Sequence, residues 1–489
     1  MPTLVHEVDD ITLPSSTSAV VVQTALQTPC RAPARERWSW ALYDFATTIF
    51  SMNVTTLYFA VWLVSDLHTS NTIVALGNGI ASTLVVLSIP MLGALSDLTQ
   101  RRRPWVIGFT LLSLAGTLLI GVIGQRLIPL VGDAVVAPVV MEKYQLGGGA
   151  LVAVLAAFVL ASYGHQGALP FYNAMMPGLA PRREWGRLSG MGAAMAYCGS
   201  IFGVLMITPF FNGAFPVFGP LPGRVMHVLR TLVPFTAPGG RVSTFVPTAL
   251  LSLCFSLPLF ILCKDRFATR DDPLEHPSQR FANDISMRST LREAKRYPGT
   301  LRFLMASFLY QDAMGTVISY MALYAVMAMG FTRGAEATLF VVLTVPAVVG
   351  SWLWGAMTDR VGPKTTLLFI IGAWITLLLG MMVVSSQRAF WAVGACIGFI
   401  YGGVNVAERP MLLRLVPEHE AGRFFSVMVL SARAAAILGP FIWGFAVDGL
   451  TPVIGIGLAY RAAVGTIAVA MLIAFFVLRG VPVPERESA

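Results

Sequence analysis

Long apolar runs follow one another along the chain and are separated by polar connections. In a helix that rises 1.5 Å per residue, roughly 20 apolar residues cross a hydrocarbon core about 30 Å thick. We find twelve such runs, at about 39–64, 72–96, 104–124, 148–171, 187–208, 244–263, 302–328, 335–357, 365–385, 389–408, 423–447 and 459–479. The pattern predicts an all-α integral membrane protein with twelve transmembrane helices.

The composition agrees with this prediction and excludes several functional classes. Of the 489 residues, 56% are hydrophobic and only 12% are charged, whereas soluble proteins carry about 25% charged residues. The sequence contains no G-x-x-x-x-G-K-S/T, H-E-x-x-H or G-x-S-x-G segment, and its five cysteines form no C-x-x-C pair. We therefore expect neither an enzyme nor a metal or cofactor site, and we expect that any work is driven by a gradient.

The basic residues are distributed unevenly between the two sides of the predicted helices. The tails and the even-to-odd connections hold 25 of the 34 Lys and Arg residues, the other connections hold eight, and Arg433 lies inside a span. By the positive-inside rule both termini are cytoplasmic, in the plasma membrane or, for a bacterium, the inner membrane. This bias accounts for most of the formal charge of +9, so we expect no nucleic-acid partner.

Polar segments divide the chain into two halves of six spans each. We expect a flexible cytoplasmic tail at 1–37, helical bundles at 38–263 and 301–480, a cytoplasmic linker at 264–300 and a second tail at 481–489. The linker segment "SMRSTLREAKRYP" is either a basic helix on the anionic inner leaflet or a solvated helix.

Three segments of the first half recur in the second half. They are "GALSDLTQRR" (93–102) with "GAMTDRVGPK" (355–364), "LAPRREWGR" (179–187) with "LVPEHEAGR" (415–423), and "ALYDF" (41–45) with "FLYQDA" (308–313). Each pair occupies the same place in its half. A six-span unit repeated in parallel predicts a transporter whose two halves rock against each other.

The repeated segments also resemble known families. "GAMTDRVGPK" is similar to the signature loop of the major facilitator superfamily, with Met357 and Pro363 as departures, and the first copy departs further at Leu98 and Gln100. "SWALYDFATTIF", "YNAMMPGLAPRREWGRLSG" and "FLYQDAMGTVISY" resemble the vacuolar amino-acid effluxers of autophagy and their bacterial relatives. The resemblance runs from about residue 38 to 480. It implies two pseudo-symmetric six-helix bundles and transport of amino acids.

The repeated loops supply candidates for a cytoplasmic gate. Asp97 and Asp359 precede basic residues, where each carboxylate can pair with arginine and face the positive end of a neighbouring helix; the alternative is a static surface ion pair. Glu184 and Glu420 either form a second part of the cytoplasmic gate or simply stabilise the starts of spans 5 and 11. The full candidate set is Gly93, Asp97, Arg101, Arg102, Glu184, Arg187, Gly355, Asp359, Arg360, Lys364, Glu420 and Arg423.

Two charged residues lie deep within predicted spans. Arg433 is ten residues into span 11, about 15 Å from its start, where a charge costs roughly 2.5–3.5 kcal/mol unless it has a partner or water. Asp312 lies at a similar depth in span 7. We hypothesise that Asp312 is the proton-sensitive group and that Arg433 anchors an anionic group of the solute. A permanent structural salt bridge is the alternative.

Asp44 is the counterpart of Asp312 in the first half. It lies seven residues past Arg37, about 10 Å along the helix, so we place it near the cytoplasmic mouth, within reach of interfacial water. One extra residue between Tyr310 and Asp312 turns the two acids about 100° apart around their helices.

The ends of spans 4 and 10 add polar candidates. Gly164, Gly167 and Pro170 are expected to loosen span 4 around His165, unless that histidine is simply an interhelical donor; Asn405, Glu408 and Arg409 occupy the corresponding end of span 10. The candidates for solute or coupling-ion binding are Tyr43, Asp44, His165, Gln166, Asn173, Tyr310, Gln311, Asp312, Asn405 and Arg433.

The sequence thus favours a monomeric secondary active transporter that moves a small polar, amino-acid-like solute by alternating access. We expect the bilayer, the solute and a proton or sodium ion as partners, with proton coupling preferred. Two alternatives stay open, a sodium-coupled sugar symporter and a non-transporting assembly protein that keeps the fold.

Overall fold

A computed structural model describes residues 31–67, 69, 71–127, 148–215, 219–236, 239–266, 294–330 and 336–482. Most of the expected N-terminal tail, most of the central linker, including the start of its possible basic helix, and most of the C-terminal tail lie outside these residues.

The N-terminal half contains six long helical segments. The first segment begins with α2 (Ala34–Phe50) and continues through the π-helical turn η1 (Ser51–Tyr58), the short α-helix α3 (Phe59–Val61) and the π-helical turn η2 (Trp62–Asp66). The other five are α4 (Asn71–Thr99), α5 (Arg103–Leu127), α6 (Gly148–Ala174), α7 (Trp185–Asn212) and α9 (Phe245–Leu262). Short 3-10 turns η4 (Met176–Gly178) and η5 (Arg182–Glu184) precede α7. Between α7 and α9 lie the antiparallel strands β1 (Ala214–Phe215) and β2 (Gly219–Pro220), helix α8 (Gly223–Leu232) and the turn η6 (Arg241–Thr244).

The C-terminal half is built from α12 (Thr300–Met329), α13 (Glu336–Val361), α14 (Pro363–Val383), α15 (Gln387–Leu415), the turn η7 (Glu418–Glu420), α16 (Ala421–Ile454) and α17 (Ile456–Arg479). Each of the twelve predicted spans coincides with a long helical segment among the described residues. Nine of these segments are long and apolar enough to cross a membrane by length and composition, and α12, α13 and α16 lie beside them. The predicted all-α class is confirmed.

The outer surfaces of the helices are apolar. Leu87, Val383 and Phe445 on α4, α14 and α16 have exposed fractions of 73%, 79% and 77%. In a soluble protein such side chains would be costly to leave in water, whereas lipid tails solvate them at no cost. The same environment favours helices because each helix satisfies its own backbone polar groups.

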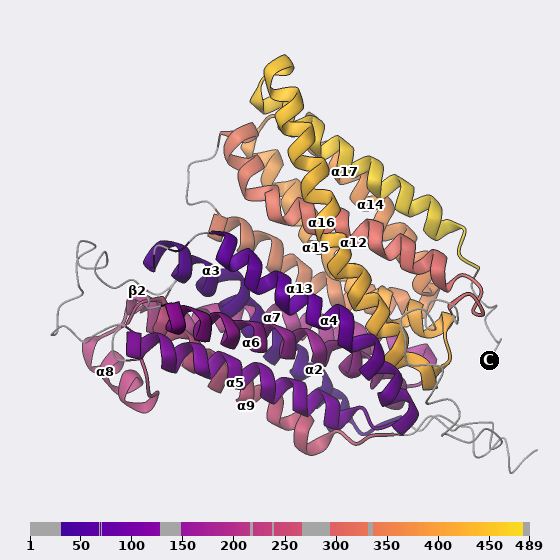
Figure 1. Ribbon diagram of the computed structural model, residues 1–489. Coiled ribbons are helices and arrows are strands. Elements are labelled where there is room, and N and C mark those ends of the chain that lie inside the picture. Colours follow the sequence, from indigo (N-terminus) through magenta and orange to yellow (C-terminus); the bar gives the residue numbers. More distant parts are fainter. Residues whose placement is uncertain are drawn as a thin grey trace, which may run out of the picture.

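The two halves meet mainly along two pairs of helices, with further contacts of α7 with α15 and of α6 with α16. Helix α7 packs against α13, and α4 packs against α16, so each half contributes one helix to each contact. In Figure 1 the indigo-to-magenta half and the orange-to-yellow half lie together near the C-terminus and diverge toward the other end.

Helix α6 is unbroken from Gly148 to Ala174, so the expected loosening around His165 is wrong. The glycines serve close packing instead. A Cβ atom on Gly164 would lie 2.5 Å from the backbone nitrogen of Ser113 and 2.6 Å from the carbonyl oxygen of Phe109, both on α5. The absence of side chains on this face of α6 therefore brings α5 and α6 into backbone contact.

Gly164→Val should lower the free energy of unfolding by about 1–3 kcal/mol, because the added atoms force α5 and α6 apart. The matched control is Gly108→Val on α5, where an added Cβ atom meets no atom within 4 Å. Unfolding of both variants in mixed detergent micelles would measure the difference, and equal losses would contradict this account of the packing.

Candidate substrate and gating site

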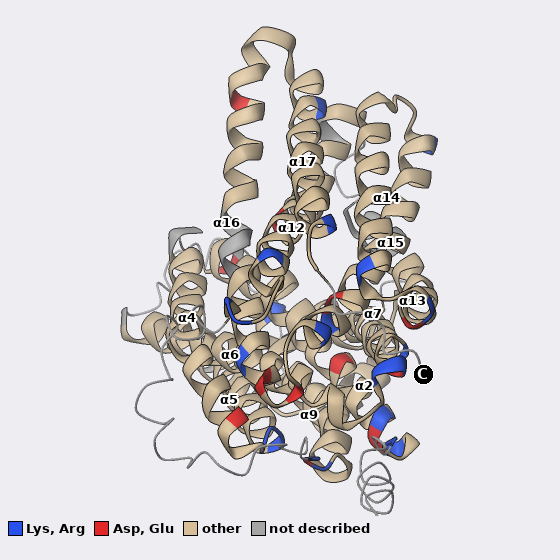
Figure 2. Ribbon diagram, turned by 90° about the vertical axis from the view of Figure 1, so that its right-hand side faces the viewer, with Lys and Arg blue, Asp and Glu red and all other residues tan. Residues whose placement is uncertain are grey.

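Charged loops from both halves converge at one end of the bundle, which we call the basic end. The connections between α4 and α5, α6 and α7, α13 and α14, and α15 and α16 all reach it. In Figure 2 the charged residues gather largely where the halves meet, whereas the far parts of α14, α16 and α17 carry few.

Asp97, near the end of α4, binds the start of α16 in the other half. Its carboxylate accepts hydrogen bonds from the backbone N–H groups of Gly422 (3.0 Å) and Arg423 (2.7 Å). The first N–H groups of a helix lack partners within the helix and carry partial positive charge. Asp97 therefore caps α16 and joins the two halves.

Asp359, near the end of α13, makes the equivalent contact with α7 in the other half. Its carboxylate accepts hydrogen bonds from the backbone N–H groups of Gly186 (2.7 Å) and Arg187 (3.0 Å), and Nε of Arg187 lies 3.7 Å from it. Each half thus caps a helix of the other half with a carboxylate from the same repeat position.

Glycines allow the helices to come close enough for these caps. A Cβ atom on Gly186 would lie 2.6 Å from the carbonyl oxygen of Gly355, and one on Gly93 would lie 2.9 Å from that of Gly422. A side chain at these positions would hold the backbones apart and lengthen the capping hydrogen bonds.

Arg102 links several segments at the basic end. Its guanidinium lies 3.5 Å from Asp97 and donates to the carbonyl oxygens of Ala174 and, at 2.8 Å, Glu418 of the other half. Burial lowers the pKa of the Arg102 guanidinium, an effect that Asp97 opposes. Arginine remains protonated in proteins, so Arg102 adds a permanent positive charge between the halves.

The other gate candidates have varied surroundings. Glu184 pairs with Arg31 (3.0 Å) and Arg37 (3.8 Å) of its own half. Lys364 donates to the carbonyl oxygen of Val481 (2.6 Å), also within its own half. Arg101 and Arg360 are exposed at the basic end, and Glu420 lies 3.9 Å from His419.

Deeper in the bundle, Asp44 of α2 forms an ion pair with Arg409 of α15. Nη1 of Arg409 lies 3.0 Å from Oδ2 of Asp44, and the exposed fractions of the two side chains are only 14% for Arg409 and 5% for Asp44. Because α2 and α15 belong to different halves, this pair is a buried charge contact across the interface.

Two stacked aromatic rings of the N-terminal half lie beside the Arg409 guanidinium. Trp40 and Tyr172 stack with ring centroids 4.5 Å apart, and the guanidinium carbon lies 5.7 Å from each ring. Trp40 Nε1 donates to the Tyr172 carbonyl oxygen (3.1 Å), and the Tyr172 hydroxyl donates to the Trp40 carbonyl oxygen (3.0 Å). We call Trp40, Tyr172 and Asp44 the cation cage.

Glu408 precedes Arg409 but points into the C-terminal half. Its buried carboxylate accepts hydrogen bonds from the hydroxyls of Ser307 and Tyr310 (2.8 Å) and from the Gln311 amide (2.8 Å), all on α12. Three donors from one helix hold Glu408 within its own half.

The remaining candidates lie around this centre. Asn405 donates to the Tyr197 hydroxyl (3.5 Å), and its carbonyl oxygen accepts from Ser189 (3.3 Å), both across the interface. Gln166 and Asn173 on α6 each bury an amide oxygen that has no hydrogen-bond partner among the described residues.

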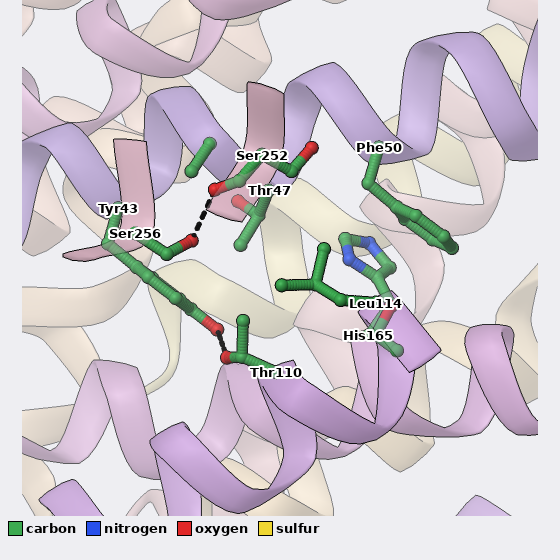
Figure 3. Close-up of a pocket in the computed structure, with 10 residues that line it drawn as sticks. Tyr43, Thr47, Phe50, Thr110, Leu114, His165, Ser252 and Ser256 are labelled. Carbon is green, nitrogen blue, oxygen red and sulfur yellow. Dashed lines mark hydrogen bonds between the residues drawn. The ribbon is translucent and has the colours of Figure 1, made fainter. Parts of the chain in front are cut away.

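A small cavity lies within the N-terminal half, between α2, α5, α6 and α9. The cavity has a volume of about 20 Å³, which is enough for one or two water molecules. Figure 3 shows His165 on one side of it and the hydrogen bond between Tyr43 and Thr110 (2.6 Å) on the other. The His165 ring packs 4.8 Å from that of Phe50.

Asp312 lies apart from these groups. Its carboxylate accepts a hydrogen bond from the backbone N–H of Gly439 on α16 (2.7 Å) and is buried. The side chain of Arg433 lies outside the described part of the chain, so its pairing with Asp312 stays a prediction.

Two expectations about the centre need correction. The predicted span 10 ended at residue 408, which placed Arg409 in a cytoplasmic connection, but α15 continues to Leu415 and buries Arg409 within the bundle. Asp44 was expected within reach of interfacial water, but its side chain is buried between the halves because Arg409 and Gly192 cover it.

Arg409→Met should lower the free energy of unfolding by about 3–5 kcal/mol, because Asp44 would be left as an uncompensated buried charge. The double variant Asp44→Asn with Arg409→Met should regain most of this loss. Arg388→Met, an exposed position on the same helix, is the matched control. An equal loss in the single and double variants would show that the two charges do not depend on each other.

Comparison with known proteins gives the family. The family model described as Major Facilitator Superfamily matches residues 43–440, with a second match at 337–489. An uncharacterised MFS-type transporter, YxiO, of Bacillus subtilis is 23% identical over 83% of this chain and 86% of its own length. Autophagy-related protein 22 of Botryotinia fuckeliana is 27% identical over 34% of this chain and 27% of its own length.

Solved structures show the same fold. The transporter FucP in its outward conformation superposes with a TM-score of 0.65 at 16% identity, covering 91% of this chain and 97% of FucP. A bacterial homologue of the iron transporter ferroportin, in an outward-facing state, gives a TM-score of 0.61 at 14% identity over 91% and 99% of the two chains. The match of the family model over most of the chain shows that this chain belongs to the major facilitator superfamily.

Proposed function

We propose that this protein is a proton-coupled secondary active transporter that moves an amino-acid-like solute by alternating access. We assign its basic end to the cytoplasm on the positive-inside rule, and the proposal therefore treats the contact between the halves at that end as the cytoplasmic closure. The observation that carries the proposal is the buried ion pair between Asp44 and Arg409, which joins the two halves.

Opening toward the cytoplasm requires α2 and α15 to separate, which breaks this pair. Asp44 would then be left buried without its partner, at a cost of several kcal/mol, and Arg409 would lose its partner in the other half. A zwitterionic solute relieves both charges, because its ammonium group can face Asp44 while its carboxylate faces Arg409. The resemblance to Autophagy-related protein 22, and to the vacuolar amino-acid effluxers, supports an amino acid as that solute.

In this proposal Asp97 and Asp359 form the cytoplasmic latch. Each must release the helix end that it caps before the halves can part. Because the caps are hydrogen bonds to a charged acceptor, the latch biases the equilibrium between the two states without touching the solute.

Asp312 is the second carboxylate proposed for coupling, with Arg433 as its partner. It is buried on α12 and accepts a hydrogen bond from Gly439 within α16. We prefer Asp44 as the coupling carboxylate because its described partner belongs to the other half. A change in the charge of Asp44 therefore acts directly on the interface.

Reconstitution into proteoliposomes tests the function. We expect accumulation of a labelled amino acid when a pH gradient is imposed, and loss of this accumulation in Asp44→Asn. If Asp312 also carries the proton, Asp312→Asn loses pH-driven accumulation as well; unchanged accumulation removes Asp312 from the mechanism. Accumulation of sugars driven by a sodium gradient, with none of amino acids, would overturn the proposal.

The latch predicts a change in accessibility. Ser189 is fully buried on α7, and its hydroxyl donates to the backbone carbonyl oxygen of Asn405 on α15, so a cysteine at Ser189 reports separation of the halves. Asp97→Asn and Asp359→Asn weaken hydrogen bonds worth about 1.5–3 kcal/mol and should raise the rate at which Ser189→Cys is alkylated severalfold. Arg101→Gln, an exposed change nearby, should leave the rate unaltered. Unchanged rates in both aspartate variants would refute the latch.

A further inference from the structure

Arg409 occupies a site that the N-terminal half forms by itself. We propose that the cation cage, Trp40, Tyr172 and Asp44, is a binding subsite for an organic cation, the ammonium or guanidinium group of the solute. Arg409 fills this subsite as an internal substitute while the basic end is closed. The inference rests on the proposed transport function and adds which chemical group of the solute is recognised, and where.

The cage does not depend on the C-terminal half for its shape. Trp40 and Tyr172 are fully buried and hold each other through two reciprocal hydrogen bonds and a nearly parallel stack, with an interplanar angle of 10°. The Tyr43 ring supports Tyr172 from the same half, at a centroid distance of 4.9 Å. When α15 withdraws, the rings and the carboxylate are therefore expected to stay in place.

The chemistry of the cage selects a cation with apolar edges. Trp and Tyr faces attract a cation within about 6 Å of the ring centroid, and the Asp44 carboxylate supplies the opposite charge and a hydrogen-bond acceptor. Gly192 keeps the space open, because a Cβ atom there would lie 2.6 Å from Asp44 Oδ2 and 3.3 Å from Arg409 Nη1. Since the guanidinium of Arg409 fits, groups of this size or smaller can enter once it leaves.

Glu408 provides a counter-charge for the displaced arginine. It adjoins Arg409 in the chain, and Ser307, Tyr310 and Gln311 of the same half hold its carboxylate. Both charges travel with the C-terminal half when the halves part. Arg409 can therefore exchange Asp44 for Glu408 without becoming an isolated buried charge, which lowers the cost of its replacement by a solute cation.

Chemical rescue tests the subsite without any transport measurement. Purified Arg409→Ala has an empty cage, so methylguanidinium and methylammonium should raise its unfolding midpoint with a saturable dependence on concentration. N-methylurea, which is similar in shape but neutral, should not. The double variant Asp44→Asn with Arg409→Ala should lose the response, and Arg414→Ala should show none. Equal responses to N-methylurea, or a full response in the double variant, would overturn the proposal.

A second measurement uses the intact cage and does not depend on the folding of Arg409→Ala. In a protein whose only cysteine is introduced by Ser189→Cys, methylguanidinium should compete with Arg409 and increase the alkylation rate severalfold, whereas N-methylurea should not. Glu408→Gln should blunt this increase, because the displaced arginine then lacks its second partner; Tyr310→Phe, which keeps the charge of Glu408, should preserve it. No effect of the cation on alkylation would refute displacement.

These results separate the subsite from the transport proposal. Cation-specific rescue and accelerated alkylation without uptake in proteoliposomes would leave the subsite in place and remove the proposed function. Amino-acid uptake without any cation response would leave the proposed function in place and remove the subsite.

Discussion

A charge buried away from water needs a partner, and in this protein one such requirement is met only by contact between the two halves. Asp44 and Arg409 lie on helices of different halves and are both largely shielded from solvent. Neither half can move away without exposing its charge, finding another partner or taking up a ligand. The relative position of the bundles is therefore tied to the ionic contents of the centre, which is the basic condition for coupling solute movement to conformational change.

The basic end adds a second constraint of a different kind. Asp97 and Asp359 each cap a helix that begins in the opposite half, and glycines at 93, 186 and 355 let the backbones approach. Helix ends supply partial charges that remain wherever the helix goes, so in the proposed transport cycle these contacts are remade each time the halves close. In that proposal the central pair responds to what is bound, whereas the caps set how strongly the closed arrangement is favoured.

Hydropathy and internal repetition were sufficient to predict the fold, because lipid imposes long apolar helices and the loop motifs occur twice in the sequence. The central pair was not predicted, because hydropathy places the end of a span only to within several residues. Moving the end of span 10 from residue 408 to Leu415 changes Arg409 from a surface charge to a buried one. The predicted loosening of span 4 near His165 was wrong for a related reason. From the sequence, a glycine that loosens a helix cannot be told apart from a glycine that packs against a neighbouring helix. One usable signal was present: the repeat that aligns Leu179 with Leu415 also aligns Tyr172 with Glu408 and Asn173 with Arg409.

That alignment shows how the two halves diverged at their shared site. The first half carries its acid on α2, at Asp44, opposite the neutral Tyr172; the second half carries its acid on α15, at Glu408, opposite the neutral Gln311. Arg409 is the one cation among these described groups, so the two carboxyl groups share a single guanidinium and the cluster has one basic group fewer than it has acids. A buried cluster with such a deficit favours the entry of one more cation, whether a proton or an ammonium group. Exact symmetry between the halves would have removed this deficit or doubled it, and the unequal placement of the acids is what leaves room for one positive charge at a time.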